Sequence, residues 1–418
     1  MTNVPAMVTT DPLQAQPKFS GPAEEVAPGV FMHSLFVNTY ALKTPEGLLL
    51  IDPGTSRGAP AVHAAIRGWT AEPVHTIVYT HGHLDHAFGG KPFLAEGSVR
   101  NIVAQENCVG RFRRYALTHG FNELINQRQF GSDKLRFPNE YDWPTLTFRD
   151  GLVQRMGDLE IRYRAAKGET DDHCYVWVPE KSYLFTGDLI VWRSPNCGNP
   201  QKVQRYPIEW AEALEEMAAL DAEWLFPGHG LVVRGRAEVR RVLTETARYL
   251  RHIIDQVVPL LNAGRSPEEI VAAVESDPEL AQRPYLLELY DHPKFIVRNL
   301  IRRWGGWWNG VAADLFPASS ARQAAEIAAL AGGVPALVAR GRALLAAGDL
   351  ELACHVAEWA NRAAPDNVAA LELKRDAYEK RGAATGNLMA QGIYRGAMNE
   401  ALVALGQEKA QKAGGYSL

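Results

Sequence analysis

One short stretch of the sequence decides the fold, and it reads Tyr79-Thr80-His81-Gly82-His83-Leu84-Asp85-His86-Ala87-Phe88-Gly89-Gly90. His81, His83 and Asp85 alternate, so their side chains can point the same way in an extended or turning segment. His86 breaks the alternation, as a turn into a helix would. The β-branched and aromatic run before the first histidine predicts a buried strand. The two closing glycines let the backbone pass close to whatever these side chains hold.

Imidazole and carboxylate groups together suit zinc or another first-row metal, at ligand distances of about 2.0–2.2 Å. Four such groups this close in sequence can build most of one metal shell, or parts of two adjacent shells. A polar loop with exposed histidines is the plainer interpretation. That interpretation is disfavoured because the succession is what a metal-binding turn requires: a strand, then a cluster of ligand side chains, then glycines that let the backbone approach closely. The stretch therefore predicts a metal site at the end of a strand.

Length and composition limit the number of domains and the kinds of partner to be expected. The chain has 418 residues, which allows two or three domains of ~150 residues each. Its net charge of −4, with both signs well mixed, indicates neither a nucleic-acid partner nor a basic membrane patch. The four cysteines are widely spaced and include no CxxC pair, which fits a reducing compartment. Met1–Glu25 lacks the apolar core of a secretory signal, and no run is long enough to span a bilayer. We therefore expect a cytoplasmic protein.

The ligand pattern His81-x-His83-x-Asp85-His86 resembles the metal-binding signature of the metallo-β-lactamase superfamily. That resemblance implies an α+β fold, an αββα sandwich with a two-metal site at one edge of its sheets. Four further segments resemble the superfamily's other motifs in the same order along the chain, which argues against chance. They are Asp52-Pro53-Gly54, Gly168-Glu169-Thr170, Leu184-Phe185-Thr186-Gly187-Asp188 and Pro227-Gly228-His229-Gly230.

The resemblance also implies a ligand set for two divalent ions. One ion would be held by His81, His83 and Glu169, the other by Asp85, His86 and His229, and both by Asp188. Glu169 stands where most superfamily members carry a histidine, and His173 is the alternative third ligand for the first ion. Asp52 would support the site without binding metal, as carboxylates behind histidine ligands do. Zinc is the expected metal, although the same ligands accept manganese or iron.

A narrower resemblance is to the alkyl sulfatase branch, whose members carry a helical dimerisation domain after the metal domain. It implies a metal-binding hydrolase domain over 30–245 and an all-helical dimerisation-type domain over 246–418. Residues 1–29, before these domains, look like a loose N-terminal arm. The aromatic and glycine-rich run Trp304–Gly310 suggests a surface against another element or subunit. The alanine-rich helices after it include a pair that looks like a tetratricopeptide-type hairpin. We therefore expect a homodimer through the helical domain.

The function implied is hydrolysis of a small anionic ester, most simply an alkyl sulfate, by a metal-activated hydroxide that releases alcohol and sulfate. The sulfatases carry a histidine soon after the bridging carboxylate, and residues 189–199 here contain none. We expect Arg193, Asn196 and Arg205 to grip the substrate oxyanion, with surface cations as the alternative for the two arginines. Asp85 and His173 are the candidate catalytic groups. His173 would protonate the leaving group unless it is only a strand-end surface side chain.

Three other functions remain open at this stage. The same metals could hydrolyse a phosphodiester, a lactone or a thioester, and the missing histidine favours this alternative. A non-catalytic protein that binds a partner through its helical part is the second. All seven ligand positions carry competent side chains, which argues against a dead site. Iron-dependent oxidation is the third. The stretch Ala116–Trp143 is polar, aromatic and irregular, which indicates a long functional loop. The superfamily resemblance implies that such an insertion covers the metal cleft, and the alternative is that its aromatic residues only pack it onto the core.

Overall fold

The structure is a computed structural model that describes residues 4–411, and these residues form two compact units. The first unit, here called the sheet unit, comprises the chain up to Asn122 together with Phe137–Trp304. The second, here called the helical unit, comprises Glu123–Arg136 and the chain from Gly305. The sheet unit carries every residue that the sequence assigned to the metal site.

The sheet unit contains two seven-stranded sheets among the described residues. The N-terminal sheet has β2 (Glu24–Ala27), β3 (Val30–Ser34), β4 (Asn38–Thr44), β5 (Gly47–Ile51), β6 (Val74–Val78), β7 (Asn101–Gln105) and β8 (Leu146–Phe148) in spatial order. The C-terminal sheet has the order β1 (Val8–Thr9), β14 (Val232–Arg234), β13 (Trp224–His229), β12 (Tyr183–Val191), β11 (Cys174–Val178), β10 (Leu159–Ala165) and β9 (Gly151–Met156).

The strands are apolar on both faces because both faces are covered. In β5, Leu49 and Ile51 belong to the core between the sheets, while Leu48 and Leu50 belong to the core under the outer helices. This alternation follows from the two-residue period of a strand. Tyr40 of β4 joins the two sheets, since its ring lies 5.5 Å from that of Phe185. A run such as Leu48–Ile51 therefore indicates a central strand of a layered fold.

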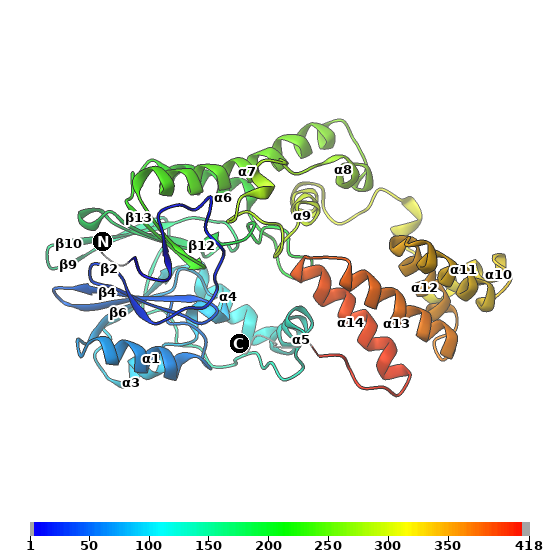
Figure 1. Cartoon of the computed structure of the whole chain (residues 1–418), viewed down its shortest axis with the longest axis horizontal. Helices are drawn as coiled ribbons and strands as arrows, with labels where there is room; N and C mark the ends of the chain where they lie inside the picture. Colours follow the sequence, from blue (N-terminus) through cyan, green and yellow to red (C-terminus); the bar gives the residue numbers. More distant parts are fainter. Residues whose placement is uncertain (1–3, 412–418) are drawn as a thin grey trace. The chain divides into compact units, whose positions relative to one another are not determined.

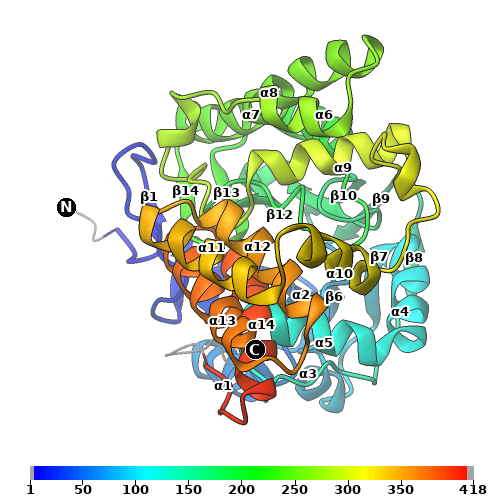
Figure 2. The same cartoon turned by 90° about the vertical axis from the view of Figure 1, so that its right-hand side faces the viewer.

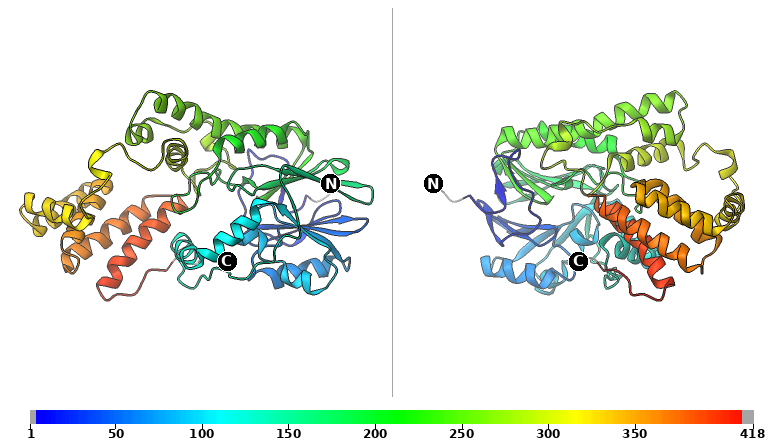
Figure 3. Two further views of the ribbon diagram at one scale, coloured as in Figure 1. Left: turned by 180° about the vertical axis from the view of Figure 1, so that it is seen from behind. Right: turned by 45° about the vertical axis from the view of Figure 1, so that its right-hand side comes forward.

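Helices cover the outer face of each sheet (Figure 1, and from behind in Figure 3). The N-terminal sheet packs against α1 (Ala59–Trp69), α3 (Lys91–Ala95) and α4 (Asn107–Leu117). The C-terminal sheet packs against α6 (Pro207–Ala218) and α7 (Arg236–Asn262). The layers are helix, sheet, sheet and helix, so the predicted αββα sandwich is confirmed. The unit is completed by α2 (Leu84–Ala87), η1 (Pro179–Lys181), α8 (Pro267–Ala273), η2 (Leu280–Gln282) and α9 (Pro293–Gly305).

The structure corrects three expectations about segments outside the motifs. The described part of the predicted arm, residues 4–29, is not loose, since β1 pairs with β14 and β2 pairs with β3. The stretch Ala116–Trp143 is not a long loop, because α5 (His119–Phe130) occupies much of it. The division into compact units falls at residues 304/305 rather than 245/246. Residue 245 lies in the middle of α7, whose apolar side packs on the C-terminal sheet, so no boundary can form there.

The helical unit is all-α, and its successive helices pack against one another (Figure 2). Its elements are the part of α5 from Glu123 onward, η3 (Ala312–Asp314), α10 (Ser320–Leu330), α11 (Val334–Ala347), α12 (Leu350–Ala363), α13 (Val368–Ala383) and α14 (Leu388–Ala404). Small residues let these helices approach closely. A Cβ on Gly341 of α11 would lie 2.5 Å from Leu373 Cδ2 of α13. The predicted helical hairpins are therefore present, with Asp349, Asn367 and Asn387 as side-chain N-caps.

Among the described residues, no single helix has both the length and the apolarity needed to cross a bilayer. Helices α10 and α11 meet that test only as a pair, with a bend of 87° between them.

Candidate metal centre

Most of the ligand-bearing residues follow or end a strand of the sandwich. His81 and His83 follow β6, and α2 begins at Leu84 directly after them. Glu169 lies in the loop between β10 and β11, Asp188 lies in β12, and His229 ends β13. Strand ends position side chains rigidly while leaving one side open, which suits a metal site.

The first group of ligands comprises His81, His83, Glu169 and Asp188, whose ligand atoms all lie within 4.8 Å of one another. His81 Nε2 lies 2.8 Å from His83 Nδ1 and 3.8 Å from Asp188 Oδ2. His83 Nδ1 lies 3.6 Å from Glu169 Oε1. These separations are those of atoms that can share one ion at about 2.0–2.2 Å from each. The group contains Glu169, whereas His173 is not a member.

The second group comprises Asp85, His86 and His229. Asp85 Oδ2 lies 3.5 Å from His229 Nε2 and 3.7 Å from His86 Nε2. Asp188 also faces this group, because its Oδ1 lies 3.2 Å from His86 Nε2 and 3.4 Å from His229 Nε2. One oxygen of Asp188 thus faces each group, which is the arrangement of a bridging carboxylate.

The residues fit two divalent cations on their own chemistry. Asp85, Glu169 and Asp188 bring three carboxylates together in a site that is largely withdrawn from solvent. Buried charges of one sign are tolerated only when they are paired or bind metal. His86 Nε2 and Asp188 Oδ1 are buried and accept or donate no hydrogen bond within the described part of the chain. Atoms of this kind are the ones that a metal would satisfy.

Hydrogen bonds from outside the ligand groups fix two histidine rings. Asp52 Oδ2 lies 2.8 Å from His86 Nδ1, which leaves Nε2 facing the ligands. Asp52 is in turn held by Thr80, whose backbone N–H and hydroxyl donate to it at 2.8 and 2.7 Å. His229 Nδ1 donates to the Phe36 carbonyl at 2.6 Å. The structure therefore places Asp52 in the supporting position that the sequence assigned to it, and such contacts raise ligand basicity.

Metal binding is expected to release protons. Burial lowers the pKa of His229, but Asp188 and Asp85 outweigh burial and raise it to about 10. Burial also lowers the pKa of His86, and Asp188 with Asp52 raises it well above the usual value. Both rings are therefore protonated at neutral pH in the metal-free chain, and only the neutral ring binds metal. Affinity for metal should therefore fall as pH drops below about 10, the pKa of His229. Calorimetric titrations in buffers of different ionisation enthalpy measure the released protons, and a pH-independent affinity would contradict this expectation.

His173 does not occupy a position that suits the predicted leaving-group acid. It is fully buried, and its ring stacks on that of His81 with centroids 4.7 Å apart. Its Nε2 accepts the backbone N–H of Asp188 at 3.1 Å. Burial lowers the pKa of His173 to about 4, with Asp188 opposing the shift. The ring therefore supports the bridging carboxylate from behind, where a substrate does not reach it.

Two of the three predicted substrate-binding residues lie beside the first group. Asn196 Nδ2 and Arg205 Nη2 both donate to Glu169 Oε1, the latter at 3.3 Å. Both side chains are buried, yet Asn196 Oδ1 and two of the guanidinium nitrogens, Nε and Nη1 of Arg205, make no hydrogen bond among the described residues. Arg193 differs, since its guanidinium lies 4.9 Å from the ring of Phe19. Burial raises the pKa of Glu169 to about 8, while Arg205 opposes that shift.

The loop that carries Asn196 is held by hydrogen bonds to the segment that precedes α9. Ser194 N–H donates to the Leu287 carbonyl at 3.1 Å, and Gly198 N–H donates to the Asp291 carboxylate. A Cβ on Gly198 would lie 2.2 Å from the backbone nitrogen of Ile296, so only glycine fits where this loop meets α9. Segments separated by about a hundred residues along the chain thereby fix the Asn196 amide.

Sequence reasoning missed four polar side chains near the ligands. Arg111 and Asp172 form a buried ion pair beneath the His81–His83 turn. Lys202 and Tyr290 lie within electrostatic reach of Glu169. Burial, reinforced by Arg205, lowers the pKa of Lys202 to about 7. The adjacent acidic pair at positions 171 and 172 was a usable signal, whereas nothing local marks Tyr290, which enters from a distant segment.

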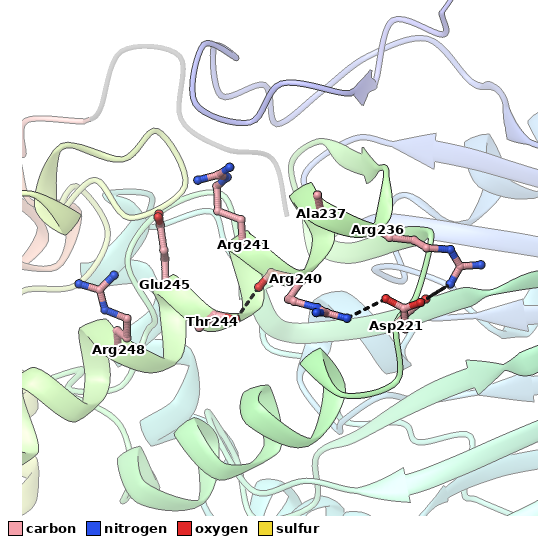
Figure 4. Close-up of a pocket in the computed structure, with 8 residues that line it drawn as sticks. All are labelled: Asp221, Arg236, Ala237, Arg240, Arg241, Thr244, Glu245 and Arg248. Carbon is pink, nitrogen blue, oxygen red and sulfur yellow. Dashed lines mark hydrogen bonds and ion pairs between the residues drawn. The ribbon is translucent and has the colours of Figure 1, made fainter.

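A surface cavity of about 530 Å³ on α7 is a separate feature (Figure 4). Four arginines project from one side of that helix, at positions 236, 240, 241 and 248. Arg236 and Arg240 pair with Asp221 at 3.0 and 2.8 Å. This cavity contains none of the ligand residues. Both of its carboxylates are paired, since Glu245 also lies 2.9 Å from Arg283 Nε.

Comparisons with known proteins find relatives for both parts of the chain. The metallo-beta-lactamase superfamily model matches residues 34–229, and the alkyl sulfatase dimerisation model matches residues 266–402. A linear primary-alkylsulfatase of Pseudomonas sp. is 30% identical over 386 residues, which is 84% of this chain and 72% of that protein. An (R)-specific secondary-alkylsulfatase of Pseudomonas sp. is 24% identical over 391 residues, covering 85% of this chain and 58% of that protein. The solved structure of a stereoselective inverting sec-alkylsulfatase from Pseudomonas sp. superposes with a TM-score of 0.82 at 22% identity, covering 90% of this chain and 65% of that one.

Proposed function

Because the chain belongs to the alkylsulfatase family of the metallo-β-lactamase superfamily, we propose that it hydrolyses alkyl sulfate esters to an alcohol and sulfate. One observation carries the proposal. The two ligand groups share Asp188, and a buried guanidinium with unsatisfied N–H groups lies beside them. The chain spans 72% and 58% of the two curated relatives described above, so the substrate class is a proposal for this chain.

Arg205 and Asn196 are the groups proposed to hold the sulfate. A buried N–H group without an acceptor costs about 1–3 kcal/mol, and a ligand oxygen removes that cost. Arg205 offers two such nitrogens, Nε and Nη1, in the planar fork that suits tetrahedral oxyanions. Its bond to Glu169 fixes the guanidinium, so little side-chain entropy is lost on binding. The sulfate would lie between this fork and the ligand groups.

The chain's residues prepare the site for attack on that sulfate. Two divalent ions, when bound, would supply hydroxide near neutral pH and stabilise developing negative charge. His81, His83 and Glu169 would hold one ion, while Asp85, His86 and His229 would hold the other. Asp188 keeps both groups in register, because the backbone N–H of Asp188 is fixed by His173. The buried cluster excludes bulk water, which strengthens each electrostatic contact.

The identity of the metal is proposed to be zinc, since ligand sets of two imidazole nitrogens with carboxylate oxygens are ordinary for it. Metal analysis of purified protein by mass spectrometry tests this directly. Manganese or iron in its place would leave the ligand assignment intact, because all three ions accept these donors.

The test of the function is release of inorganic sulfate from medium-chain primary and secondary alkyl sulfates, followed by ion chromatography. We expect two metals per chain and sulfate release that a chelator abolishes and added metal restores. Two metals without sulfate release would overturn the substrate class, and panels of phosphodiesters, lactones and thioesters would follow. A folded protein that binds no metal would overturn the enzyme proposal itself.

A homodimer is proposed on the exposed aromatic segment that opens the helical unit. Trp307 is 74% exposed and Phe316 is 91% exposed, and both lie within the region that matches the dimerisation family. Large apolar side chains at such exposure mark contact surfaces. Phe316→Glu should convert the dimer to a monomer in light scattering at micromolar concentration. Val153→Glu, which changes an exposed side chain of the sheet unit, is the matched control. A dimer that survives Phe316→Glu unchanged would contradict the assignment of this surface.

A cytoplasmic location is also proposed. Its support is that all four cysteines are free and three of them are buried, which fits a reducing compartment. Cell fractionation with antibody detection tests it, and recovery outside the cytoplasm would contradict it.

A further inference from the structure

The turn between His81 and His83 rests on a buried carboxylate from another loop. Asp172 is fully buried, and its Oδ2 accepts the backbone N–H of Gly82 at 2.8 Å. A Cβ on Gly82 would lie 3.0 Å from that oxygen and 2.9 Å from Arg111 Cδ. The turn is therefore seated directly on the Asp172 and Arg111 side chains, with no room for a larger residue.

Arg111 of α4 holds that carboxylate in place. Its Nε donates to Asp172 Oδ1 at 2.7 Å, and its Nη2 donates to Asp171 Oδ1 at 2.5 Å. Arg111 is 4% exposed, so the pair is withdrawn from solvent. Burial lowers the pKa of Arg111, but Asp172 outweighs burial and raises it, so the guanidinium stays charged. Exposed ion pairs contribute little to the stability of a fold. Breaking a buried pair is costly, because it leaves an uncompensated charge inside the protein.

This pair connects the two segments that supply the first ligand group. Asp172 lies in the same loop as Glu169, only three residues further on, and Gly82 lies between His81 and His83. Movement of Asp172 would therefore change the distance between the Glu169 carboxylate and the two rings. The spacing of the second ligand group does not depend on the position of Asp172. There, His86 is fixed by Asp52, and His229 is fixed by the Phe36 carbonyl.

We propose that the Arg111–Asp172 ion pair is a positioning device for the first metal ion alone. It sets the spacing of His81, His83 and Glu169, and so determines the affinity of that ion independently of the second. Both side chains act through the ligands and touch neither substrate nor metal. The inference rests on the proposed two-metal centre, and its consequence is that the two ions can be lost separately.

The test uses two backgrounds that isolate the two sites. His229→Ala removes a ligand of the second ion and reports on the first, whereas Glu169→Ala removes a ligand of the first ion and reports on the second. Asp172→Asn is then added to each. The asparagine keeps an oxygen for the Gly82 N–H and loses the charge that faces Arg111. Zinc affinity of the metal-depleted chain is measured by competition with a chromophoric chelator.

We expect Asp172→Asn to weaken zinc binding about 10–100-fold in the His229→Ala background, the range for residues that orient a metal ligand. In the Glu169→Ala background the change should be less than about twofold. Arg149→Gln is the matched control, because Arg149 also pairs with a glutamate next to α4 but is 77% exposed. It should change neither affinity.

Two results would overturn the proposal. One is an equal loss of affinity in both backgrounds, which would make the pair a general scaffold. The other is no loss in the His229→Ala background. If Asp172→Asn does not fold, Arg111→Lys takes its place, since lysine keeps the charge without the two-pronged contact. If the unsubstituted chain binds no divalent metal, the proposed function fails. If it binds two ions and Asp172→Asn does not weaken the first ion selectively, only this inference fails.

Discussion

Glu169→Ala is expected to reduce sulfate release by more than ~100-fold, beyond the range for residues that only support a ligand. Glu169 is the carboxylate that the β10–β11 loop contributes to the first group. Its loss also leaves Arg205 buried beside no acceptor, since Glu169 Oε1 receives the Nη2 bond. Metal content should fall from two ions per chain toward one. Sulfate is measured by ion chromatography and metal by mass spectrometry of the same sample.

The matched control for that variant is Glu180→Ala, which removes an exposed glutamate and should change neither quantity. His173→Ala separates the two candidate third ligands. We expect it to retain both ions, because the structure engages its Nε2 with the backbone of Asp188. If His173→Ala lost an ion while Glu169→Ala kept two, the ligand assignment would be reversed.

Arg205→Lys is expected to lower kcat/KM for alkyl sulfates by about 100-fold while both metals remain bound. Lysine preserves the charge beside Glu169 but lacks the planar fork that offers Nε and Nη1 to an oxyanion. Steady-state kinetics over a series of alkyl chain lengths measures the effect. The loss should be the same at every chain length, since Arg205 would contact the sulfate rather than the alkyl group.

Arg193→Lys is the informative comparison, because the sequence placed Arg193 and Arg205 in the same role. The structure directs Arg193 over the ring of Phe19, so this variant should stay within a few-fold of the unsubstituted enzyme. Equal losses in the two variants would mean that the sulfate does not bind where we propose. An unchanged Arg205→Lys enzyme would lead to the same conclusion.

The sequence alone determined the fold class and named the candidate metal-binding residues that the structure brings together. The run Leu48–Ile51 predicts a central strand because an apolar residue is needed on both faces of a covered sheet. The alternation of His81, His83 and Asp85 predicts convergent ligands because a strand end projects them together. The helix caps at Ser266 and Asp349 are also local, since each capping side chain bonds to backbone three residues further on. Signals of this kind depend on neighbours in the chain.

The tertiary structure decided everything that depends on distant segments. It buried His173 behind Asp188, separated the roles of Arg193 and Arg205, and paired residues 8–9 with β14 in a sheet. None of these outcomes has a local pattern, because burial and charge pairing arise only when segments far apart in sequence meet. The Arg111–Asp172 pair is the clearest case. Its two members lie 61 residues apart, and their effect on the His81–His83 turn exists only once the loops have packed together.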